Sequence, residues 1–488
     1  MKRIVLFFFI FIFLMTCVLA QYPIIDYAQA EVDFSKKLRD WDGFGFNYVE
    51  TCQTLDYDTN PQEYGGFSLL TQSDRDKVID MVFGEDGLKV GLLKMFFGPF
   101  HQEKPGGIFD HEKATQYTRM FAHEGYRKTI ERGGSMQIIT TLYGPPAWAT
   151  LQKIVRGRDI DPSQKENLAN YMVSWVKFLI ENEKLPVKYI SIHNEGEDWY
   201  RWPADGKKAT VGIGDDYNVF YTPQLIAEFM PILKTQLRKA GLNNVGVTPG
   251  EATNWFRFYY WGTAPVVADD AQALDAMDLI TSHGFYNGNY GQWFGEHSSV
   301  GIDLLREKKP GLHAWVTSTS WSQMDARNIK EMHGNIYTAK VNAIIPWAGI
   351  QRPPQWLGGD PNPGSAFTVH EDGTLEIRRG YYFYKQISRA GQPGMAVARA
   401  YSLSSEVVLI AFAANETKNS DALVIVNYGR RTQKVRVSIK GANHGSYSAF
   451  RTNQDSEYYK DIGFFYPSDS ILEYEAPAGS VTTFFAKQ

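Results

Sequence analysis

Residues 189–199 read YISIHNEGEDW, and this stretch carries the strongest structural signal in the chain. It starts as a short apolar run of the kind that forms a buried strand, and it ends on Asn194 and Glu195 before Gly196 interrupts it. In a barrel of parallel strands, residues at the carboxyl ends of the strands line the rim of the active-site pocket. The stretch therefore predicts a strand that brings the Glu195 carboxyl group to the rim of a pocket.

The chain around this stretch alternates between strand-like and helix-like segments as far as about residue 379. Besides residues 189–193, the predicted strands cover residues 44–49, 88–96, 136–142, 245–248, 279–283, 313–317 and 343–347. Amphipathic segments between them predict helices at residues 73–83, 115–132, 165–183, 223–240 and 328–340. Strands that alternate with helices in this way predict an α/β fold, namely a (β/α)8 TIM barrel.

The pattern changes after about Gly380, where short strand-like runs separated by polar and glycine-containing turns replace the alternation. The runs at residues 397–403, 406–414, 422–426, 432–439, 446–452 and 482–485 predict strands, and no long helical period appears. These features predict a C-terminal all-β sandwich. Residues 22–40 predict a further strand that leads into the fold.

The amino-terminal residues have the pattern of a cleavable signal peptide. The positive Lys2-Arg3 pair precedes an apolar run at residues 4–14, and small residues suit cleavage after Ala20. The run is short and polar sequence follows it, so a membrane anchor is the less favoured interpretation and no membrane span is expected in the mature chain. The protein is therefore predicted to be exported, to the periplasm, the cell surface or the medium.

The composition excludes several classes of function. The formal net charge is −4, so the chain offers no basic field for nucleic acid. No Cys/His cluster has zinc spacing, no glycine-rich phosphate loop follows a strand and no Gly-x-Ser-x-Gly elbow occurs, so no metal or other cofactor is predicted. Aromatic residues make up 14% of the chain and include 12 Trp, and aromatic faces outside a core suit stacking on sugar rings.

Polar and aromatic residues follow most of the predicted strands, at the ends that meet at the barrel rim. An Asn side chain can form hydrogen bonds with a sugar hydroxyl while an adjacent Glu protonates the glycosidic oxygen, so Glu195 is predicted to be catalytic. Glu251 is the predicted second catalytic carboxylate, although its place after Pro249-Gly250 equally suits a solvent-exposed turn. The predicted substrate-binding residues are Asn194, Trp148, His283, Tyr286, Ser318, Trp321 and Trp347. The predicted partner is therefore a glycan.

Several short stretches occur in the order found in one known family. They are Gly43-Phe44-Gly45, Pro145-Pro146-Ala147-Trp148, Asn194-Glu195, Ser282-His283-Gly284-Phe285, Trp315-Val316-Thr317 and Gly391-Gln392-Pro393-Gly394. With them, nearly the whole mature chain resembles glycoside hydrolase family 30, within the clan of retaining barrel glycosidases. The resemblance implies that Glu195 is the acid/base and that the N-terminal strand joins a side domain. The domains expected are a signal peptide at 1–20, that strand at 21–40, the barrel at 41–379 and the β-sandwich at 380–488.

One position departs from this resemblance. A nucleophilic Glu is implied directly after the Trp-x-Thr motif, but this chain has Ser318 there, and no Asp or Glu lies between Glu307 and Asp325. A retaining glycosidase needs two carboxyl groups about 5–5.5 Å apart. Serine without an activating base is a poor substitute for the missing carboxylate. The departure therefore leaves the mechanism open.

Three hypotheses fit these observations. In the first, an exported glycosidase cleaves β-glycosidic bonds in a polysaccharide or oligosaccharide with inversion, and a carboxylate across a gap of about 6.5–9.5 Å activates water. Glu251 is the first candidate for this base, and Glu50 and Asp325 are the others. In the second, one of these carboxylates is a displaced nucleophile, and in the third the protein has lost hydrolysis and only binds glycans. The enzyme hypotheses are favoured, because a protein that only binds glycans does not need the acid Glu195.

Overall fold

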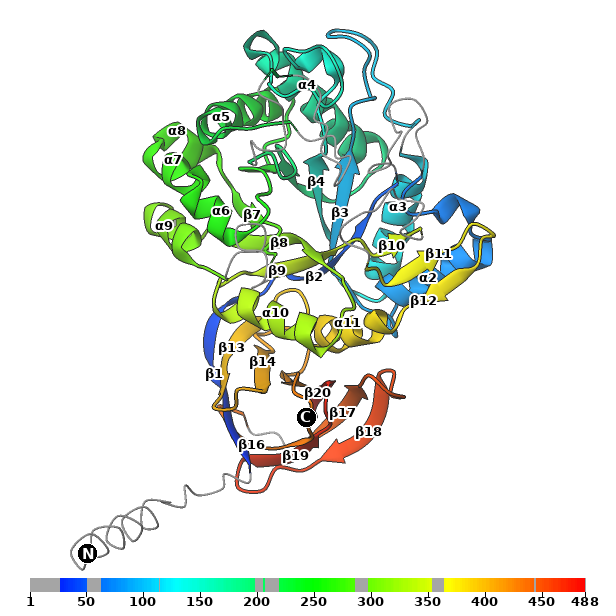
Figure 1. Cartoon of the computed structure of the whole chain (residues 1–488), viewed down its shortest axis with the longest axis vertical. Coiled ribbons are helices and arrows are strands. Elements are labelled where there is room, and N and C mark those ends of the chain that lie inside the picture. The colour runs from blue at the N-terminus through cyan, green and yellow to red at the C-terminus, as the bar shows by residue number, and fades with distance from the viewer. Residues whose placement is uncertain are drawn as a thin grey trace, which may run out of the picture.

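The computed structural model of the protein describes residues 27–50, 63–113, 115–197, 205–206, 219–285, 297–352, 364–442 and 445–487. Figure 1 shows two parts, a barrel surrounded by helices and a smaller β-rich part beside it. The signal peptide predicted at residues 1–20 and the predicted binding residue Tyr286 lie outside the described residues.

The predicted barrel strands form one parallel sheet. They are β2 (Gly43–Tyr48), β3 (Leu92–Phe97), β4 (Gln137–Leu142), β5 (Val187–Ser191), β6 (Gly246–Thr248), β7 (Leu279–Ser282), β8 (His313–Ser320) and β9 (Ala343–Trp347). The order in this 8-stranded sheet is β6-β5-β4-β3-β2-β9-β8-β7, and single bridges from Val247 to Met277 and from Ala252 to Ser282 join its two edges. The sheet is thereby closed, and the predicted (β/α)8 TIM barrel is confirmed.

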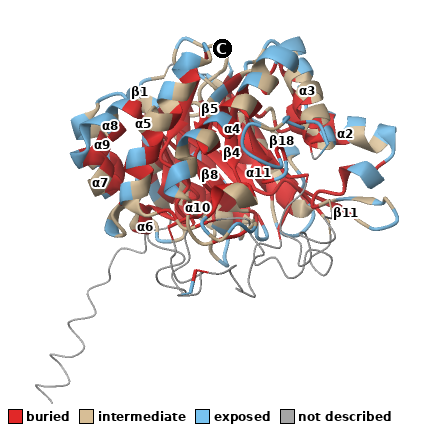
Figure 2. Cartoon of the chain, turned by 90° about the horizontal axis from the view of Figure 1, so that it is seen from above, coloured by how far each residue is buried: buried red, intermediate tan, exposed pale blue. Residues whose placement is uncertain are grey.

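Helices cover the outside of the barrel and bury their apolar faces against it, as the red inner surfaces in Figure 2 show. They are α2 (Gln72–Phe83), α3 (Gln116–Glu131), α4 (Lys165–Lys177), α5 (Pro223–Lys239), α6 (Trp255–Tyr260), α7 (Thr263–Asp269), α8 (Ala271–Ala276), α9 (Val300–Lys308) and α10 (Ala326–Tyr337). A π-helical turn, Phe178–Asn182, continues α4, and 3-10 turns lie at Phe67–Leu69, Ala147–Ala149 and Pro162–Gln164. The helices α6 to α9 were not predicted, because each is too short to show a clear helical period.

A second sheet of nine strands forms the β-rich part. Its strands are β1 (Ala28–Asp40), β13 (Ala396–Ser402), β14 (Val407–Ala413), β15 (Ala422–Asn427), β16 (Gln433–Lys440), β17 (Ser446–Thr452), β18 (Lys460–Phe465), β19 (Ile471–Ala476) and β20 (Ser480–Lys487). The order is β18-β17-β20-β15-β14-β13-β1-β16-β19, so β1 lies inside the sheet between β13 and β16. Val32, Leu409, Ile425, Val437 and Phe484 share an apolar core of its own. The predicted all-β side domain is thus confirmed, and its unpredicted strands β18 and β19 are the two edges.

Helix α11 (Arg379–Ala390) connects the two parts. The expectation that no helix follows Gly380 is wrong here. The aromatic run at residues 381–384 favours a strand by local preference, but Tyr381, Tyr384 and Ile387 are buried at helical spacing between barrel and sheet. Ser388 Oγ donates to Leu88 O (2.9 Å) on the barrel side, and Thr483 Oγ1 of β20 donates to Gln386 O (2.9 Å) on the other. Tertiary packing therefore overrides the local preference.

A small sheet of β10 (Ile350–Gln351), β11 (Phe367–Val369) and β12 (Leu375–Ile377) flanks the barrel. Within the described ranges, no helix combines the length and the apolar character that crossing a membrane requires.

Candidate active site

The inward-facing side chains of the barrel form layers, because successive residues of a strand point to opposite faces. The layer nearest the amino ends of the strands is apolar and contains Leu92, Ile139, Leu279, Trp315 and Ile345. Two residues further along four of these strands, the next layer is polar and fully buried. It contains Lys94, Thr141, Thr281 and Thr317. Aromatic side chains of Phe96, Tyr143 and Trp347 follow near the carboxyl ends. The buried ammonium group of Lys94 needs a charged partner, because an unpaired buried charge is costly.

Glu195 stands at the carboxyl end of β5 in a strained conformation. Its φ of 44° lies in the left-handed region, which costs a residue with a Cβ about 1–2 kcal/mol. Backbone hydrogen bonds hold it there, since Glu195 N donates to Glu251 O (2.8 Å) and Glu251 N donates to His193 O (3.0 Å). These bonds continue the β5–β6 pairing beyond both strands and fix Glu195 and Glu251 side by side. Strain of this kind concentrates at functional sites.

Gly250 turns the chain so that Glu251 enters the barrel. Its φ is +86°, and a Cβ atom at this position would lie 2.1 Å from Nε2 of the His193 imidazole, so no other residue fits. Glu251 is fully buried, which removes the alternative of a solvent-exposed turn. The Pro249-Gly250 pair therefore marks a place where the backbone passes close to the His193 ring.

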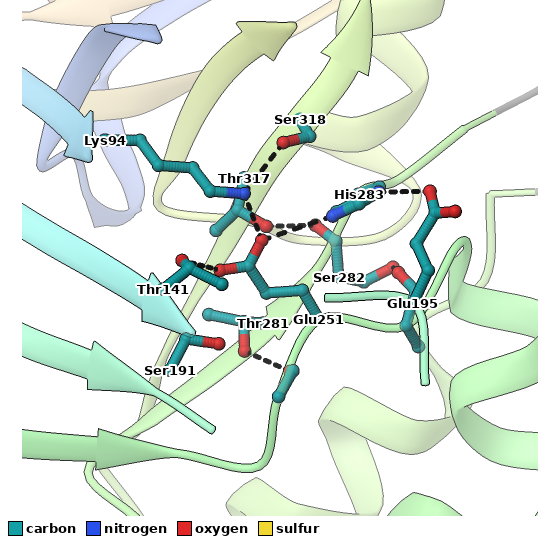
Figure 3. Close-up of polar contacts among 12 residues, drawn as sticks. Lys94, Thr141, Ser191, Glu195, Glu251, Thr281, Ser282, His283, Thr317 and Ser318 are labelled. Atoms are coloured by element: carbon teal, nitrogen blue, oxygen red, sulfur yellow. Dashed lines mark hydrogen bonds and ion pairs between the residues drawn. The ribbon is translucent and has the colours of Figure 1, made fainter. Parts of the chain in front are cut away.

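The fully buried carboxylate of Glu251 is bound from three sides (Figure 3). Its Oε2 atom contacts the Lys94 ammonium in a buried ion pair, and Thr141 Oγ1 donates to its Oε1 atom at 2.5 Å. Burial alone would raise the pKa of Glu251, but the Lys94 charge and the contact with His283 outweigh burial and lower the pKa to about 2. Glu251 is thus held as a carboxylate across the whole range of ordinary pH.

The imidazole of His283 separates the two glutamates. His283 Nδ1 lies 2.7 Å from Glu195 Oε1, and His283 Nε2 lies 3.2 Å from Glu251 Oε2. Burial lowers the pKa of His283, but its contacts with Glu195 and Glu251 outweigh burial, and the net pKa is raised above 6.5. Figure 3 shows the resulting row of contacts, from Lys94 through Glu251 and His283 to Glu195.

Ser318 lies on the other side of Lys94. Lys94 Nζ donates to Ser318 Oγ at 2.9 Å, and Asn47 Nδ2 lies 3.5 Å from the same oxygen. An ammonium that donates to a hydroxyl cannot take its proton, so this contact does not activate Ser318 as a nucleophile. Among the described residues, Asn47 Oδ1 is a buried acceptor without a hydrogen-bond partner. Such an atom is available to a hydroxyl of a bound molecule.

The other two candidate bases serve as helix caps. Glu50 Oε2 accepts a hydrogen bond from Thr118 N (2.8 Å) in the first turn of α3, and burial raises the pKa of Glu50. Asp325 is the N-cap of α10 and forms a capping box with Asn328. Carboxylates are stabilising at helix N-termini, where backbone N–H groups lack partners. The structure therefore brings neither Glu50 nor Asp325 into the network of Glu195.

The predicted aromatic binding residues have separate surroundings. Trp347 lies in the aromatic layer near the carboxyl ends of the strands, against Phe96 and Tyr64. Its buried indole N–H has no partner among the described residues. Trp148 follows β4, and its indole donates to Gln102 O at 3.2 Å. Trp321 is fully buried against Phe46 and Tyr384, outside the barrel interior, and the structure does not bring it to the site.

The residues predicted from the sequence for one barrel rim include Glu195, Asn194, Glu251, His283 and Ser318. Lys94 and Thr141 were not predicted. The signal for Lys94 was present, because a single charge in the apolar run LLKMFF at residues 92–97 marks a buried partner for an acid. In the described part of the chain, no group of His, Cys, Asp and Glu side chains is arranged to hold a metal ion.

Solved structures share this fold across nearly the whole chain. The catalytic domain of GH30 xylanase C from Talaromyces cellulolyticus superimposes with a TM-score of 0.70 and 16% identity, covering 94% of this chain and 100% of that chain. An endo-β1,6-glucanase does so with a TM-score of 0.67 and 15% identity over 94% of each chain. A conserved exported protein from Bacteroides fragilis gives a TM-score of 0.69 and 13% identity over 93% of this chain and 99% of that one.

The fold of this chain is therefore of the GH30 type, as the sequence motifs implied. No protein-family model matches the sequence, and a search of curated proteins found no match either.

Proposed function

We propose that the protein is an exported glycoside hydrolase that cleaves β-glycosidic bonds in a polysaccharide or oligosaccharide, with Glu195 as the proton donor. The observation that carries this proposal is the position of Glu195. Its carboxyl group stands at the carboxyl end of a barrel strand, strained and bonded to a buried histidine, in a fold shared with xylanases and a glucanase. A strained backbone at this rim is costly to maintain, and strain of this kind is found at sites where a side chain has a catalytic role.

Glu251 is the proposed second carboxylate. It and Ser318 both contact the Lys94 ammonium, so its negative charge lies next to the position where a retaining enzyme has its nucleophile. We expect the short Ser318 side chain to leave room for a water molecule, and we propose Glu251, which also contacts the Lys94 ammonium, as the acceptor for a proton of that water. This arrangement favours inversion, in which water attacks the anomeric carbon from the face opposite to the acid. The low pKa of Glu251, about 2, makes it a weak base, so slow turnover is expected.

The test compares wild-type protein with the Glu195→Gln and Glu50→Gln variants on β-linked glycans. Glu195→Gln keeps the shape of the side chain but removes its acidic proton, and turnover is expected to fall about 100-fold or more while the glycan still binds. Glu50→Gln is the matched control, because Glu50 is also a buried carboxyl at the rim but caps α3. Full activity of Glu195→Gln, or equal losses in both variants, would refute the role of Glu195.

A second candidate function is glycan binding without hydrolysis. One observation favours it: Ser318 replaces the expected nucleophile, while all the identified contacts of the Glu251 carboxylate are with other buried side chains. This candidate predicts that isothermal titration calorimetry detects a glycan ligand and that no product forms from the same glycan during prolonged incubation. Cleavage that co-purifies with the protein and is lost in Glu195→Gln rules it out.

A further inference from the structure

The imidazole of His283 has an acid on both sides, and this arrangement restricts where its protons can be. Ionised carboxylates only accept hydrogen bonds. With Glu195 Oε1 at 2.7 Å from Nδ1 and Glu251 Oε2 at 3.2 Å from Nε2, each ring nitrogen must share a proton with the carboxylate it faces. The imidazole is nearly fully buried, so water cannot readily replace either contact.

The two sides of the imidazole differ in how firmly the proton is assigned. On the Nε2 side, Glu251 also contacts the Lys94 ammonium and accepts from Thr141, so it remains a carboxylate and His283 keeps its Nε2 proton. On the Nδ1 side, Glu195 lies at the rim, and the second proton rests on Nδ1 and can pass to Oε1 across the 2.7 Å contact. The buried pair of Lys94 and Glu251 thus fixes one proton of His283 and leaves the other to be shared with Glu195.

We infer that His283 and Glu195 form one proton-holding couple, in which His283 is a positioning residue that stores the proton that Glu195 donates to the leaving group. This inference rests on the proposed function. As the glycosidic C–O bond breaks, the shared proton moves from Glu195 to the leaving oxygen, and His283 remains as a neutral imidazole whose Nε2–H faces Glu251. Water adds its hydroxyl to the anomeric carbon and releases a proton to Glu251; exchange with solvent then removes this proton from Glu251 and returns one to Glu195 at the rim, so no proton is gained or lost over the cycle.

The couple replaces a function that the missing nucleophile has in a retaining enzyme. Two nearby carboxylates disfavour each other's ionisation, which helps the acid to keep its proton. Here Ser318 supplies no charge, and His283 holds the proton next to Glu195 instead. The charged and titratable groups identified around His283 are Glu195, Glu251, Lys94 and His193, and burial lowers the pKa of His193 to about 3, so His193 is neutral.

The couple predicts a pH dependence of definite sign. The pKa of His283 is raised above its ordinary value of 6.5, so its second proton is present at acidic and neutral pH and is lost as the pH rises through the raised pKa. The proton donor is therefore available below that pKa, and kcat/KM is expected to fall on the alkaline side at a pH above 6.5.

The experiment is a ¹⁵N NMR titration of histidine-labelled full-length protein, with His283→Asn used to assign the signals. Both nitrogens of His283 are expected to carry protons at pH 6. Glu195→Gln and Glu251→Gln are each expected to lower the titration midpoint by about one pH unit or more, because each removes one of the anions that stabilise the imidazolium. His313→Asn is the matched control. His313 Nδ1 makes a similar 2.7 Å contact with Asp42, but His313 lies at the amino end of its strand, whereas His283 follows the carboxyl end of its own.

A neutral His283 at pH 6, or a midpoint that Glu195→Gln leaves unchanged, would overturn the inference. Glu195→Gln gives a decision even if Glu251→Gln does not fold. If the wild type cleaves glycans, His283→Asn must also move the alkaline limb of kcat/KM to lower pH, whereas His313→Asn must not; a purely structural role of His283 would change KM or stability alone. If the NMR shifts appear but no glycan is cleaved, the proposed function fails while the proton sharing stands.

Discussion

Ser318 illustrates how one residue changes the chemistry that the barrel can perform. Its hydroxyl accepts a hydrogen bond from Lys94 at 2.9 Å, and a serine nucleophile would need a base in that position. The side chain is buried, and its neighbours Lys94 and Asn47 come from β3 and β2. We therefore expect Ser318 to act through its small size and its hydrogen bond to Lys94, without forming a covalent bond to the sugar.

We expect Ser318→Ala to lower kcat/KM by less than about tenfold, which corresponds to about 1.4 kcal/mol. Lys94 keeps its contact with Glu251 in this variant, so the charges of the network are unchanged. Steady-state kinetics on the best β-linked substrate measure the effect. A loss of about 1,000-fold, together with a covalent sugar adduct on the wild type by mass spectrometry, would show that Ser318 is a nucleophile.

Lys94 and Glu251 make a buried ion pair that depends on both partners. Removing one partner of such a pair leaves an uncompensated charge and costs about 3–5 kcal/mol. We therefore expect Lys94→Met to lower the free energy of unfolding in urea by this amount. Lys165→Met is the control, because Lys165 pairs with the more exposed Glu228 at 2.6 Å, and a pair of that kind contributes at most about 1 kcal/mol. Equal stability of the two variants would contradict the buried charge network.

At the scale of elements, the helix N-termini explain why two acids at the barrel rim are not part of the site. Glu50 supplies an acceptor to α3, whose own N-cap residue Thr115 makes no side-chain capping bond to the helix. Asp325 Oδ1 accepts a hydrogen bond from Arg327 N (2.8 Å), and Asp325 N donates to Asn328 Oδ1 (3.1 Å). Both carboxylates thus satisfy backbone N–H groups that the helix cannot satisfy itself.

Asp325→Ala is expected to lower the free energy of unfolding by about 1 kcal/mol, within the range measured for lost N-caps. Activity per folded molecule should not change, because the side chain does not contact the network of Glu195. Thermal unfolding and initial rates measure the two effects. Loss of activity with unchanged stability would restore Asp325 as a candidate base.

The periodicity of the sequence predicted the barrel better than it predicted the site. Each barrel strand alternates or runs apolar, and its period therefore revealed it. The cap role of Glu50 depends on Thr118, which is distant in sequence, so no local pattern could show it. The capping box of Asp325 and Asn328 could have been predicted from the sequence, and so could a buried charge at Lys94 inside an apolar strand. Helix α11 was missed because its aromatic side chains favour a strand until packing on both sides decides otherwise.

At the scale of the whole molecule, the barrel and the β-rich part share one core. A single apolar cluster contains Trp41 and Phe44 of the barrel together with Ile410, Phe412 and Val424 of the second sheet. Trp41 and Phe412 are in ring contact, with centroids 5.1 Å apart. β1 lies inside the second sheet, between β13 and β16, and leads directly into β2, so the chain crosses between the two parts both before the first and after the last barrel strand (Figure 1).

We expect the two parts to unfold together. All 12 Trp lie between residues 41 and 356, so tryptophan fluorescence reports on the barrel, while far-UV circular dichroism reports on both parts. Urea transitions followed by the two signals should coincide, because a shared core couples the stability of both parts. Two separate transitions would show that the parts are independent.

The most direct test of the whole account is a time-resolved NMR assay of wild-type protein and Glu195→Gln on a panel of β-linked glycans. The wild type is expected to release a new reducing end, with the α-anomer formed first, and Glu195→Gln is expected to form it about 100-fold more slowly or not at all at the same concentration. Turnover by Glu195→Gln near the wild-type rate would contradict the central role of Glu195, and the absence of product from the wild type across the panel would contradict the proposed hydrolase activity.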